Sequence, residues 1–187
     1  MHKFHHGNWQ RLESDERRNL IPPEQTLRRF GLKAGMKLLD IGAGTGFFSR
    51  EAGRIVGEKG RVIAAEMSED MIERMKTIGI PPNVEVVRSE EYRIPVSDST
   101  VDMVWISFVT HETPDVPRFI NEAARITKNG GKIVIVDWKK QDEEHGPAKE
   151  ERLSQETLRT LLTQYSIKEE GSLNASHYYV ELEIKKP

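Results

Sequence analysis

The sequence predicts an α/β fold: a mostly parallel seven-stranded sheet with helices on both faces and one antiparallel strand. Short apolar stretches alternate with helical patterns along most of the 187 residues, and such alternation implies parallel strands joined by right-handed crossovers. A glycine-rich turn links the first strand directly to a helix, as in sheets that bind ligands at their strand ends. The last two strand patterns have no helix between them, so one strand is expected to run antiparallel.

The first 35 or so residues are polar and carry helix signals. Ser14 precedes an acidic turn and is a typical helix N-cap. Pro22 and Pro23 then break the chain before a short amphipathic helix over residues 24–30, which ends at Gly31. The pattern predicts two short helices ahead of the first strand.

The remaining elements alternate as this fold class requires. Apolar or alternating stretches predict strands over residues 37–41, 61–66, 84–87, 101–109, 132–138, 167–170 and 178–184. Helical spacing and capping signals predict one helix that begins at residue 47 and others over residues 69–77, 116–127 and 154–165. Residues 139–151 are charged and contain a Gly-Pro pair, so we expect a surface loop there.

Composition excludes several classes of protein. A net charge of −2 leaves no basic footprint for nucleic acid, and no apolar run is long enough for membrane insertion. The N-terminus lacks the apolar stretch of a secretory signal, so we expect a cytoplasmic protein. The absence of cysteine excludes disulfides and thiolate ligands. His2, His5 and His6 have no matching carboxylate spacing, so we expect no metal.

Residues 38–46, Leu-Leu-Asp-Ile-Gly-Ala-Gly-Thr-Gly, carry the strongest functional signal. A short apolar strand contains the acid Asp40 near its end and leads into Gly42, Ala43, Gly44 and Gly46. Glycine permits positive φ and lets a ligand lie against bare backbone. The first amides of the helix that follows have no partner within the helix and point back at this loop.

The position of the acid distinguishes between two cofactors. Gly-x-Gly-x-x-Gly indicates a pyrophosphate, but here the third glycine comes one residue earlier and Asp40 stands two residues before the first. An acid there repels a pyrophosphate and suits a ligand with positive groups. S-adenosylmethionine carries an ammonium and a sulfonium, so the pattern favours this cofactor, with S-adenosylhomocysteine as product, over NAD. The alternative is a strand-to-helix turn that merely needs small residues.

Further candidates follow the second and third strands at the same edge. Glu66 ends the second strand, where an acid accepts hydrogen bonds from ribose hydroxyls. Met67 comes next and could lie on an adenine ring or pack in the core. After the third strand, in the run Ser89-Glu90-Glu91, a carboxylate could bind the adenine amino group and a backbone amide a ring nitrogen. Glu90 is the first candidate and Glu91 the second.

The end of the fourth strand supplies candidates for chemistry. A carbonyl near Ser107 could bind the ammonium of the cofactor. His111 is the first choice for a general base because its ordinary pKa lies near neutrality. The alternative is a histidine that hydrogen-bonds a loop or contacts the substrate passively. Phe108, Trp138 and Trp9 could line an apolar pocket or face the sulfonium, or they could be core residues.

With these motifs the chain resembles the class I S-adenosylmethionine-dependent methyltransferases, of the broad group that contains the ubiquinone and menaquinone biosynthesis enzymes. The resemblance covers residues 33–138 and rests on LLDIGAGTG, VIAAEMS, SEEYRIPVSDSTVD and GGKIVIVDW, in the family's order and spacing. It implies a Rossmann-like class I methyltransferase fold. It assigns Asp40 and the glycines to the methionine end of the cofactor, Glu66 to the ribose, and the pair Glu90-Glu91 to the adenine edge.

The resemblance also sets expectations for the whole chain. It implies one domain over residues 1–187, with an N-terminal helical cap (1–32) that covers the cofactor, a cofactor-binding core (33–138), and a C-terminal helix and hairpin (139–187). One departure is that the family often has Gly-Asp-Ala where this chain has Ser89-Glu90-Glu91, so a longer acid faces the adenine.

The expected function is transfer of a methyl group from S-adenosylmethionine to a small-molecule acceptor, in a protein for which a homodimer is left open. Two alternatives remain at this point. One is an NAD-dependent oxidoreductase with a compressed glycine loop, and the other is a non-catalytic S-adenosylmethionine-binding protein. Asp40 argues against the NAD-dependent oxidoreductase. Only a measurement of turnover distinguishes a non-catalytic binding protein from a methyltransferase.

Overall fold

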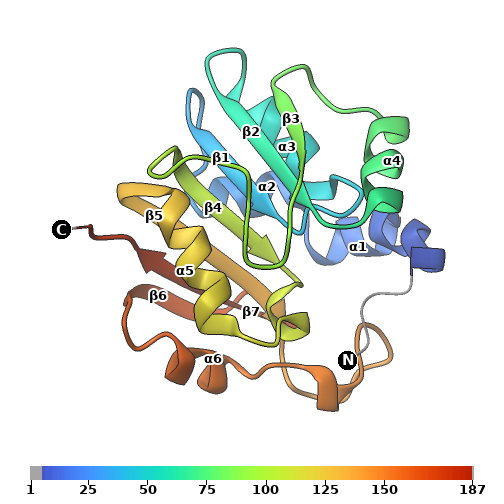
Figure 1. Ribbon diagram of the computed structural model, residues 1–187. Helices are drawn as coiled ribbons and strands as arrows, with labels where there is room; N and C mark the ends of the chain where they lie inside the picture. The colour runs from blue at the N-terminus through green and yellow to red at the C-terminus, as the bar shows by residue number, and fades with distance from the viewer. Residues whose placement is uncertain (1–5, 187) are drawn as a thin grey trace.

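The computed structural model describes residues 6–186 and contains a seven-stranded sheet in the order β3-β2-β1-β4-β5-β7-β6 (Figure 1). The strands are β1 (Lys37–Ile41), β2 (Arg61–Glu66), β3 (Val84–Arg88), β4 (Val101–Ser107), β5 (Thr127–Trp138), β6 (Ser166–Ser172) and β7 (His177–Glu183). The helices are α1 (Asp15–Leu20), α2 (Pro23–Arg29), α3 (Phe47–Val56), α4 (Glu69–Ile78), α5 (Val116–Ile126) and α6 (Gln155–Leu161). Three short 3-10 helices complete the set: η1 (His6–Glu13), η2 (Thr110–Glu112) and η3 (Lys149–Glu151).

The predicted sheet is confirmed, including its one antiparallel strand. Neighbouring strands from β3 to β5 pair in parallel, whereas β7 pairs antiparallel with both β5 and β6. The chain runs outward from β1 to β3 and then returns to place β4 on the other side of β1. Ligands of open α/β sheets bind where the strand order reverses in this way, outside the carboxyl ends of the strands. The fold therefore directs attention to the ends of β1 and β4.

Two apolar layers cover the two faces of the sheet. Helices α5 and α6 pack on one face, where Phe119, Ile120 and Leu158 are buried against the strands. Helices α2 and α3 pack on the other face with Leu27 and Phe48. In Figure 1, α5 crosses in front of the sheet and α2 and α3 lie behind it. Strands β1, β2 and β4 and the second half of β5 are thereby covered on both sides, which explains their almost continuous apolar sequences. Strand β3, at the edge of the sheet, is only partly buried.

Several element boundaries differ from the sequence prediction, most by one or two residues. Strand β5 begins at Thr127, which pairs with Val101 of β4, and not at residue 132. Strand β4 ends at Ser107, because Phe108 has a φ of +60° that interrupts the strand. Helix α6 ends at Leu161, one turn before the predicted end. Strand pairing and the positive φ of Phe108 therefore set the ends of β5 and β4. Both predicted serine N-caps are confirmed, because the side chains of Ser14 and Ser154 accept backbone amides of α1 and α6.

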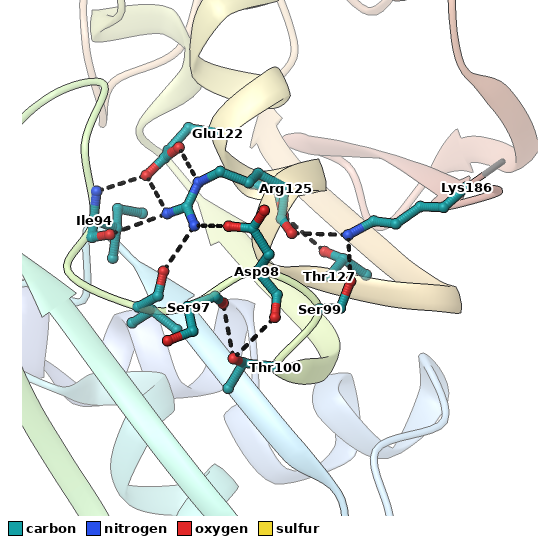
Figure 2. A network of polar contacts seen from close by, with 11 residues as sticks. Ile94, Ser97, Asp98, Ser99, Thr100, Glu122, Arg125, Thr127 and Lys186 are labelled. Carbon is teal, nitrogen blue, oxygen red and sulfur yellow. Dashed lines mark hydrogen bonds and ion pairs between the residues drawn. The ribbon is translucent and has the colours of Figure 1, made fainter.

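The loop after β3 is fastened to α5 by an arginine network, the Arg125 clamp (Asp98, Glu122, Arg125 and Lys186), shown in Figure 2. The guanidinium of Arg125 donates to both carboxylate oxygens of Glu122 at 2.8 Å. It also donates to the carbonyl of Val96 at 2.9 Å and to Asp98. Lys186 donates to the carbonyl oxygen of Arg125 at 2.8 Å, which adds the C-terminal segment to the network.

The Arg125 clamp lies away from the glycine loop, because Asp98 and Thr100 directly precede the amino end of β4. Hydrogen bonds that Arg125 donates to Glu122 and Asp98 raise its pKa, although burial opposes its charge. The clamp is thus a structural element that holds the loop carrying Glu90 and Glu91 against α5.

We expect Arg125→Ala to lower the free energy of unfolding by about 2–4 kcal/mol, because charged hydrogen bonds are lost and the 12% exposed side chain of Glu122 is left without its counter-charge. Thermal and urea unfolding followed by circular dichroism measure this change. The matched control is Arg28→Ala, which removes an exposed pair with Glu24 on α2 and should cost less than about 1 kcal/mol. Equal losses in the two variants would contradict the assignment.

Within residues 6–186, no helix has the length and apolar character needed to cross a membrane. The terminal histidines His2 and His5, considered above as metal ligands, lie outside the described residues.

Candidate functional site

The glycine loop leaves the carboxyl end of β1 and enters α3 at the point where the strand order reverses. Gly42, Gly44 and Gly46 all have positive φ, at 70°, 56° and 84°. Glycine is needed at the first of these positions for a second reason, because a Cβ there would overlap the side chain of Val109. The second glycine faces the N-terminal segment, where Leu12 lies 3.7 Å from the place of a Cβ. The loop is therefore contacted by Val109 and Leu12, while Gly42 and Gly44 remain partly exposed.

Asp40 lies beneath the glycine loop and is only 1% exposed. The hydroxyl of Ser49, on α3, donates to its carboxylate at 2.5 Å. Burial raises the pKa of Asp40 to about 7, and the charge of Glu66 adds to this, while the Ser49 hydrogen bond and the charge of Arg17 oppose it. This carboxyl therefore changes charge near neutral pH, and a nearby cation would favour its ionised form.

Glu66 holds the glycine loop and the start of α4 together at the end of β2. One carboxylate oxygen accepts the amide of Gly44 at 2.8 Å. The other accepts the amides of Met67 at 2.8 Å and Ser68 at 2.9 Å. The side chain is only partly buried, and the oxygen that accepts the amide of Gly44 has room for one further donor. Glu66 thus shapes the loop and can also accept a hydrogen bond from a ligand.

The residues predicted to meet adenine lie beside Glu66 with different exposures. Met67 is 40% exposed and is therefore not a core residue. Ser89 is 9% exposed, and its amide donates to the carbonyl of Glu66 at 3.0 Å. Glu90 is exposed and Glu91 is half-buried, in a tight turn at the start of the loop after β3. These residues form the β2–β3 part of the same edge.

The N-terminal segment closes over the glycine loop. Glu13 accepts a hydrogen bond from the hydroxyl of Thr45 at 2.6 Å and pairs with Arg50 of α3. Trp9 lies nearby on the same segment, where the guanidinium of Arg74 stacks over its ring at 4.8 Å. Both the loop and the helix that follows it are therefore tied to residues 9–13.

Arg17 on α1 is a candidate that the sequence did not reveal. Its guanidinium lies over the rings of Phe47, at 4.5 Å, and Phe108, at 5.5 Å. Burial lowers its pKa to about 10, and the negative charges of Glu13 and Asp40 partly offset this effect. Arg17 remains a cation close to the end of β1. In the sequence nothing distinguishes it from its neighbour Arg18, since only the packing of α1 brings one of the two inward.

His111 pairs with a buried acid at the end of β5. Its Nδ1 lies 2.7 Å from Asp137, which also accepts the backbone amide of His111 at 3.1 Å. Asp137 is 0% exposed and the His111 side chain 6%. Burial disfavours the imidazolium, but the hydrogen bond and the charges of Asp137 and Glu112 outweigh it, so the pKa of His111 is raised. In the neutral ring the proton sits on Nδ1, which leaves Nε2 as a proton acceptor.

Asp137 was missed as a site residue, although a signal was present. It is an acid near the end of a buried apolar strand, as Asp40 is in β1. Ser107 closes β4 nearby and is 8% exposed. This geometry is compatible with both interpretations of His111, as a general base and as a passive hydrogen-bonding residue. Nδ1 of His111 bonds Asp137, and Nε2 takes no part in that bond.

Three rings meet where β4, β5 and β7 reach the same edge, and we call Phe108, Trp138 and His177 the aromatic cluster. Ring centroids are 5.4 Å apart for Phe108 and Trp138, 4.8 Å for Phe108 and His177, and 4.4 Å for Trp138 and His177. Phe108 and Trp138 are partly exposed, so neither is an ordinary core residue. His177 is 1% exposed.

The fold and the convergence of acids on one glycine loop define the class of protein, and comparison with known proteins identifies the family. The family model of the methyltransferase domain matches residues 39–135, just over half of the chain. A solved S-adenosylmethionine-dependent methyltransferase from Aquifex aeolicus is 34% identical, with 97% of this chain and 100% of that chain covered and a TM-score of 0.91. This chain belongs to the S-adenosylmethionine-dependent methyltransferases, and the NAD-dependent oxidoreductase alternative is set aside.

Curated relatives are also methyltransferases, but they match a shorter part of the chain. The ubiquinone/menaquinone biosynthesis C-methyltransferases of Haemophilus ducreyi and Cronobacter sakazakii are 32% identical over 114 residues, 59% of this chain. The match covers 44% and 45% of those proteins, so the chain spans less than half the length of these relatives. A Pyrococcus horikoshii protein of known structure, 20% identical with a TM-score of 0.76 over 93% of each chain, supports the fold alone.

Proposed function

We propose that this methyltransferase binds S-adenosylmethionine along the carboxyl edge of β3, β2, β1 and β4 and transfers its methyl group to a small-molecule acceptor. The observation that carries the proposal is the arrangement of charge around the glycine loop. Glu66 is anchored to the amide of Gly44, Asp40 lies beneath the loop, and Arg17 lies close enough to Asp40 for their charges to interact.

These charged and polar groups match those of the cofactor from end to end. The free capacity of Glu66 suits a ribose hydroxyl. Met67 and the turn after Ser89 suit the adenine ring and its edge. Asp40 and the carbonyl of Ser107 suit the ammonium of the methionine tail, and Arg17 suits its carboxylate, since guanidinium and carboxylate form charge-assisted hydrogen bonds.

When bound, S-adenosylmethionine supplies an electrophilic methyl group on a sulfonium. The residues of this chain supply position, and orientation alone can lower the barrier by about 7–11 kcal/mol. Where the acceptor has a proton that must leave, Nε2 of His111 accepts it, and Asp137 stabilises the imidazolium that results. The N-terminal segment, tied to the loop through Glu13, excludes water from the reacting groups.

A small-molecule acceptor is supported by the names of the curated relatives. The curated relatives are named as carbon methyltransferases of quinone biosynthesis, which makes an electron-rich carbon one acceptor to test. The division into cap, core and C-terminal parts remains a prediction.

Isothermal titration calorimetry with S-adenosylmethionine and with NAD tests the cofactor assignment. We expect binding of the first and none of the second. Asp40→Asn should lower the affinity for S-adenosylmethionine about tenfold, the equivalent of about 1.4 kcal/mol for one charge interaction. The exposed Asp70 of α4 provides the control, and Asp70→Asn should leave the affinity within twofold.

The same titrations have a pH signature. Because the pKa of Asp40 is about 7 without ligand, the affinity of the wild type for a cation should rise between pH 6 and pH 7.5 as the carboxylate ionises. The affinity of Asp40→Asn should stay flat over that interval. Equal affinities for wild type and Asp40→Asn at pH 7.5, or tight binding of NAD, would contradict the proposal.

A further inference from the structure

The N-terminal segment runs along the same edge of the sheet at which we propose that the cofactor binds. At one end, Trp9 lies under the guanidinium of Arg74 on α4, the helix that follows β2. At the other end, Arg17 lies over Phe108, the residue after β4. We call residues 9–17 the strap, because they pass from the end of β2 over the glycine loop after β1 to the end of β4.

The strap contacts the backbone that a cofactor would use. Gly44 has a positive φ, and Cδ1 of Leu12 lies 3.7 Å from the place of its absent Cβ. An apolar side chain therefore already lies against this glycine. Glycines in such loops let a ligand approach the backbone closely, so a cofactor that lies against Gly44 has to displace Leu12.

Arg17 competes with the cofactor for Asp40. Its guanidinium lies 4.5 Å from the ring centroid of Phe47, directly after the glycine loop, and its charge interacts with that of Asp40. The ammonium of S-adenosylmethionine is proposed to bind the same carboxylate. Two cations beside one carboxylate repel each other, so Arg17 has to leave Asp40 when the cofactor enters. It can then turn to the carboxylate of the methionine tail.

A cluster of three polar residues fastens the strap to the glycine loop, and we call Glu13, Thr45 and Arg50 the latch. The carboxylate of Glu13 accepts the hydroxyl of Thr45 at 2.6 Å and pairs with the guanidinium of Arg50. Arg50 also donates to the carbonyl of Thr45 at 2.7 Å. Thr45 and Arg50 are both buried, so these charged hydrogen bonds are stronger than those of an exposed ion pair.

We propose that the strap is a gate, which covers the cofactor site in the free protein and moves away to admit S-adenosylmethionine, with Glu13 as the positioning residue that holds it closed. This inference rests on the proposed function, because it concerns access to the same site. The free protein is then an equilibrium between a closed and an open form, and only the open form binds. The apparent affinity and the association rate are both reduced by the fraction that is open.

Stopped-flow binding of S-adenosylhomocysteine to the full chain, followed by tryptophan fluorescence, tests the gate. In the wild type, we expect the observed rate to level off at high ligand concentration, where strap opening limits binding. Glu13→Gln keeps the size of the side chain and removes its charge, which weakens the latch and raises the open fraction. At low ligand concentration this variant should associate about five- to tenfold faster than the wild type, as loss of one charged hydrogen bond allows.

A second latch variant and a matched control accompany this measurement. Thr45→Val removes the hydroxyl that Glu13 accepts and should associate about two- to fivefold faster than the wild type. Glu51→Gln removes an acid of α3 that pairs with Arg54 on the same helix, away from the strap. Its association rate should stay within twofold of the wild type.

A latch that only braces the glycine loop predicts a different result. Its loss would weaken the site, so dissociation would become faster while association stayed equal or became slower. Equal or slower association in both latch variants therefore overturns the gate, as does an observed rate in the wild type that rises linearly with ligand concentration up to the diffusion limit. Failure of the wild type to bind S-adenosylhomocysteine in calorimetry overturns the proposed function itself.

Hydrogen exchange gives a readout that needs no substitution. Strap opening exposes the backbone amides of residues 9–17 to solvent, and a bound ligand stabilises the form that it binds. We expect these amides to exchange about tenfold more slowly in protein saturated with S-adenosylhomocysteine than in free protein. Equal exchange of the strap in the two samples would contradict the gate.

Discussion

Glu66→Ala is expected to lower the affinity for S-adenosylhomocysteine about 100- to 1000-fold. The carboxylate holds the amides of Gly44, Met67 and Ser68, and we propose that it also accepts a ribose hydroxyl. Charge-assisted hydrogen bonds contribute about 1.5–3 kcal/mol each, so loss of one to the ribose accounts for about 10- to 150-fold of this change, and loss of the loop anchor accounts for the rest. The glycine loop loses its anchor in the same variant. Calorimetry at pH 7.5 measures the change.

Two variants accompany this measurement. Glu66→Gln keeps one acceptor oxygen and should fall between the alanine variant and the wild type. Glu85→Ala removes an exposed acid from neighbouring β3, where it pairs with Arg61 at 2.7 Å, and should change the affinity less than twofold. A Glu66→Ala protein that binds within threefold of the wild type would show that this carboxylate is only a loop anchor.

His111→Ala is expected to lower kcat about 10²- to 10⁴-fold for an acceptor that must lose a proton, because general base catalysis contributes about that much. Turnover is measured as S-adenosylhomocysteine released. In the wild type, the rate should rise with pH through the raised pKa of His111, since only the neutral ring accepts a proton. Asp137→Asn should lower that pKa and the maximal rate together, because the imidazolium loses the acid at 2.7 Å.

An NMR titration of the His111 ring checks the pKa without any acceptor. Because the pKa of His111 is raised in the folded protein, the His111–Asp137 pair stabilises the fold fully at pH values below about 6.5, the ordinary pKa of histidine. This stabilisation is lost as the pH rises through the pKa of His111 in the folded protein. Asp137→Asn should therefore lower the melting temperature more at pH 5.5 than at pH 8.5. Asp102→Asn is the control, as Asp102 binds Lys128 and the amide of Lys37 near the start of β4. An unchanged His111 titration in Asp137→Asn would contradict the assignment.

Much of the site could be located from the chain alone, because strand ends and glycines are local signals. The run from Leu38 to Gly46 predicts a strand, a reversal and a helix start without any distant contact, and Glu66 marks the end of the next strand. Parallel strands bring their carboxyl ends to one edge, so candidates that lie far apart in sequence could be grouped correctly. The identity of the fold followed from this alternation.

Other features required the folded chain. The sequence predicts that Asp40 meets the cofactor, but it does not reveal that α3 brings Ser49 onto the carboxylate and buries it. The role of Glu66 as an anchor for three amides was likewise invisible, since it depends on the approach of the glycine loop to the end of β2.

The sequence by itself determined the order of the strands and helices, the glycine loop and the family to which this methyltransferase belongs, because all of these are written in short-range patterns. Tertiary structure alone decided which polar groups face one another. Arg17 comes over Phe108 only through the packing of α1, and His177 joins Trp138 only because β7 inserts beside β5. The first contact joins residues more than ninety positions apart and the second joins residues about forty positions apart. No local propensity or periodicity encodes contacts of this kind.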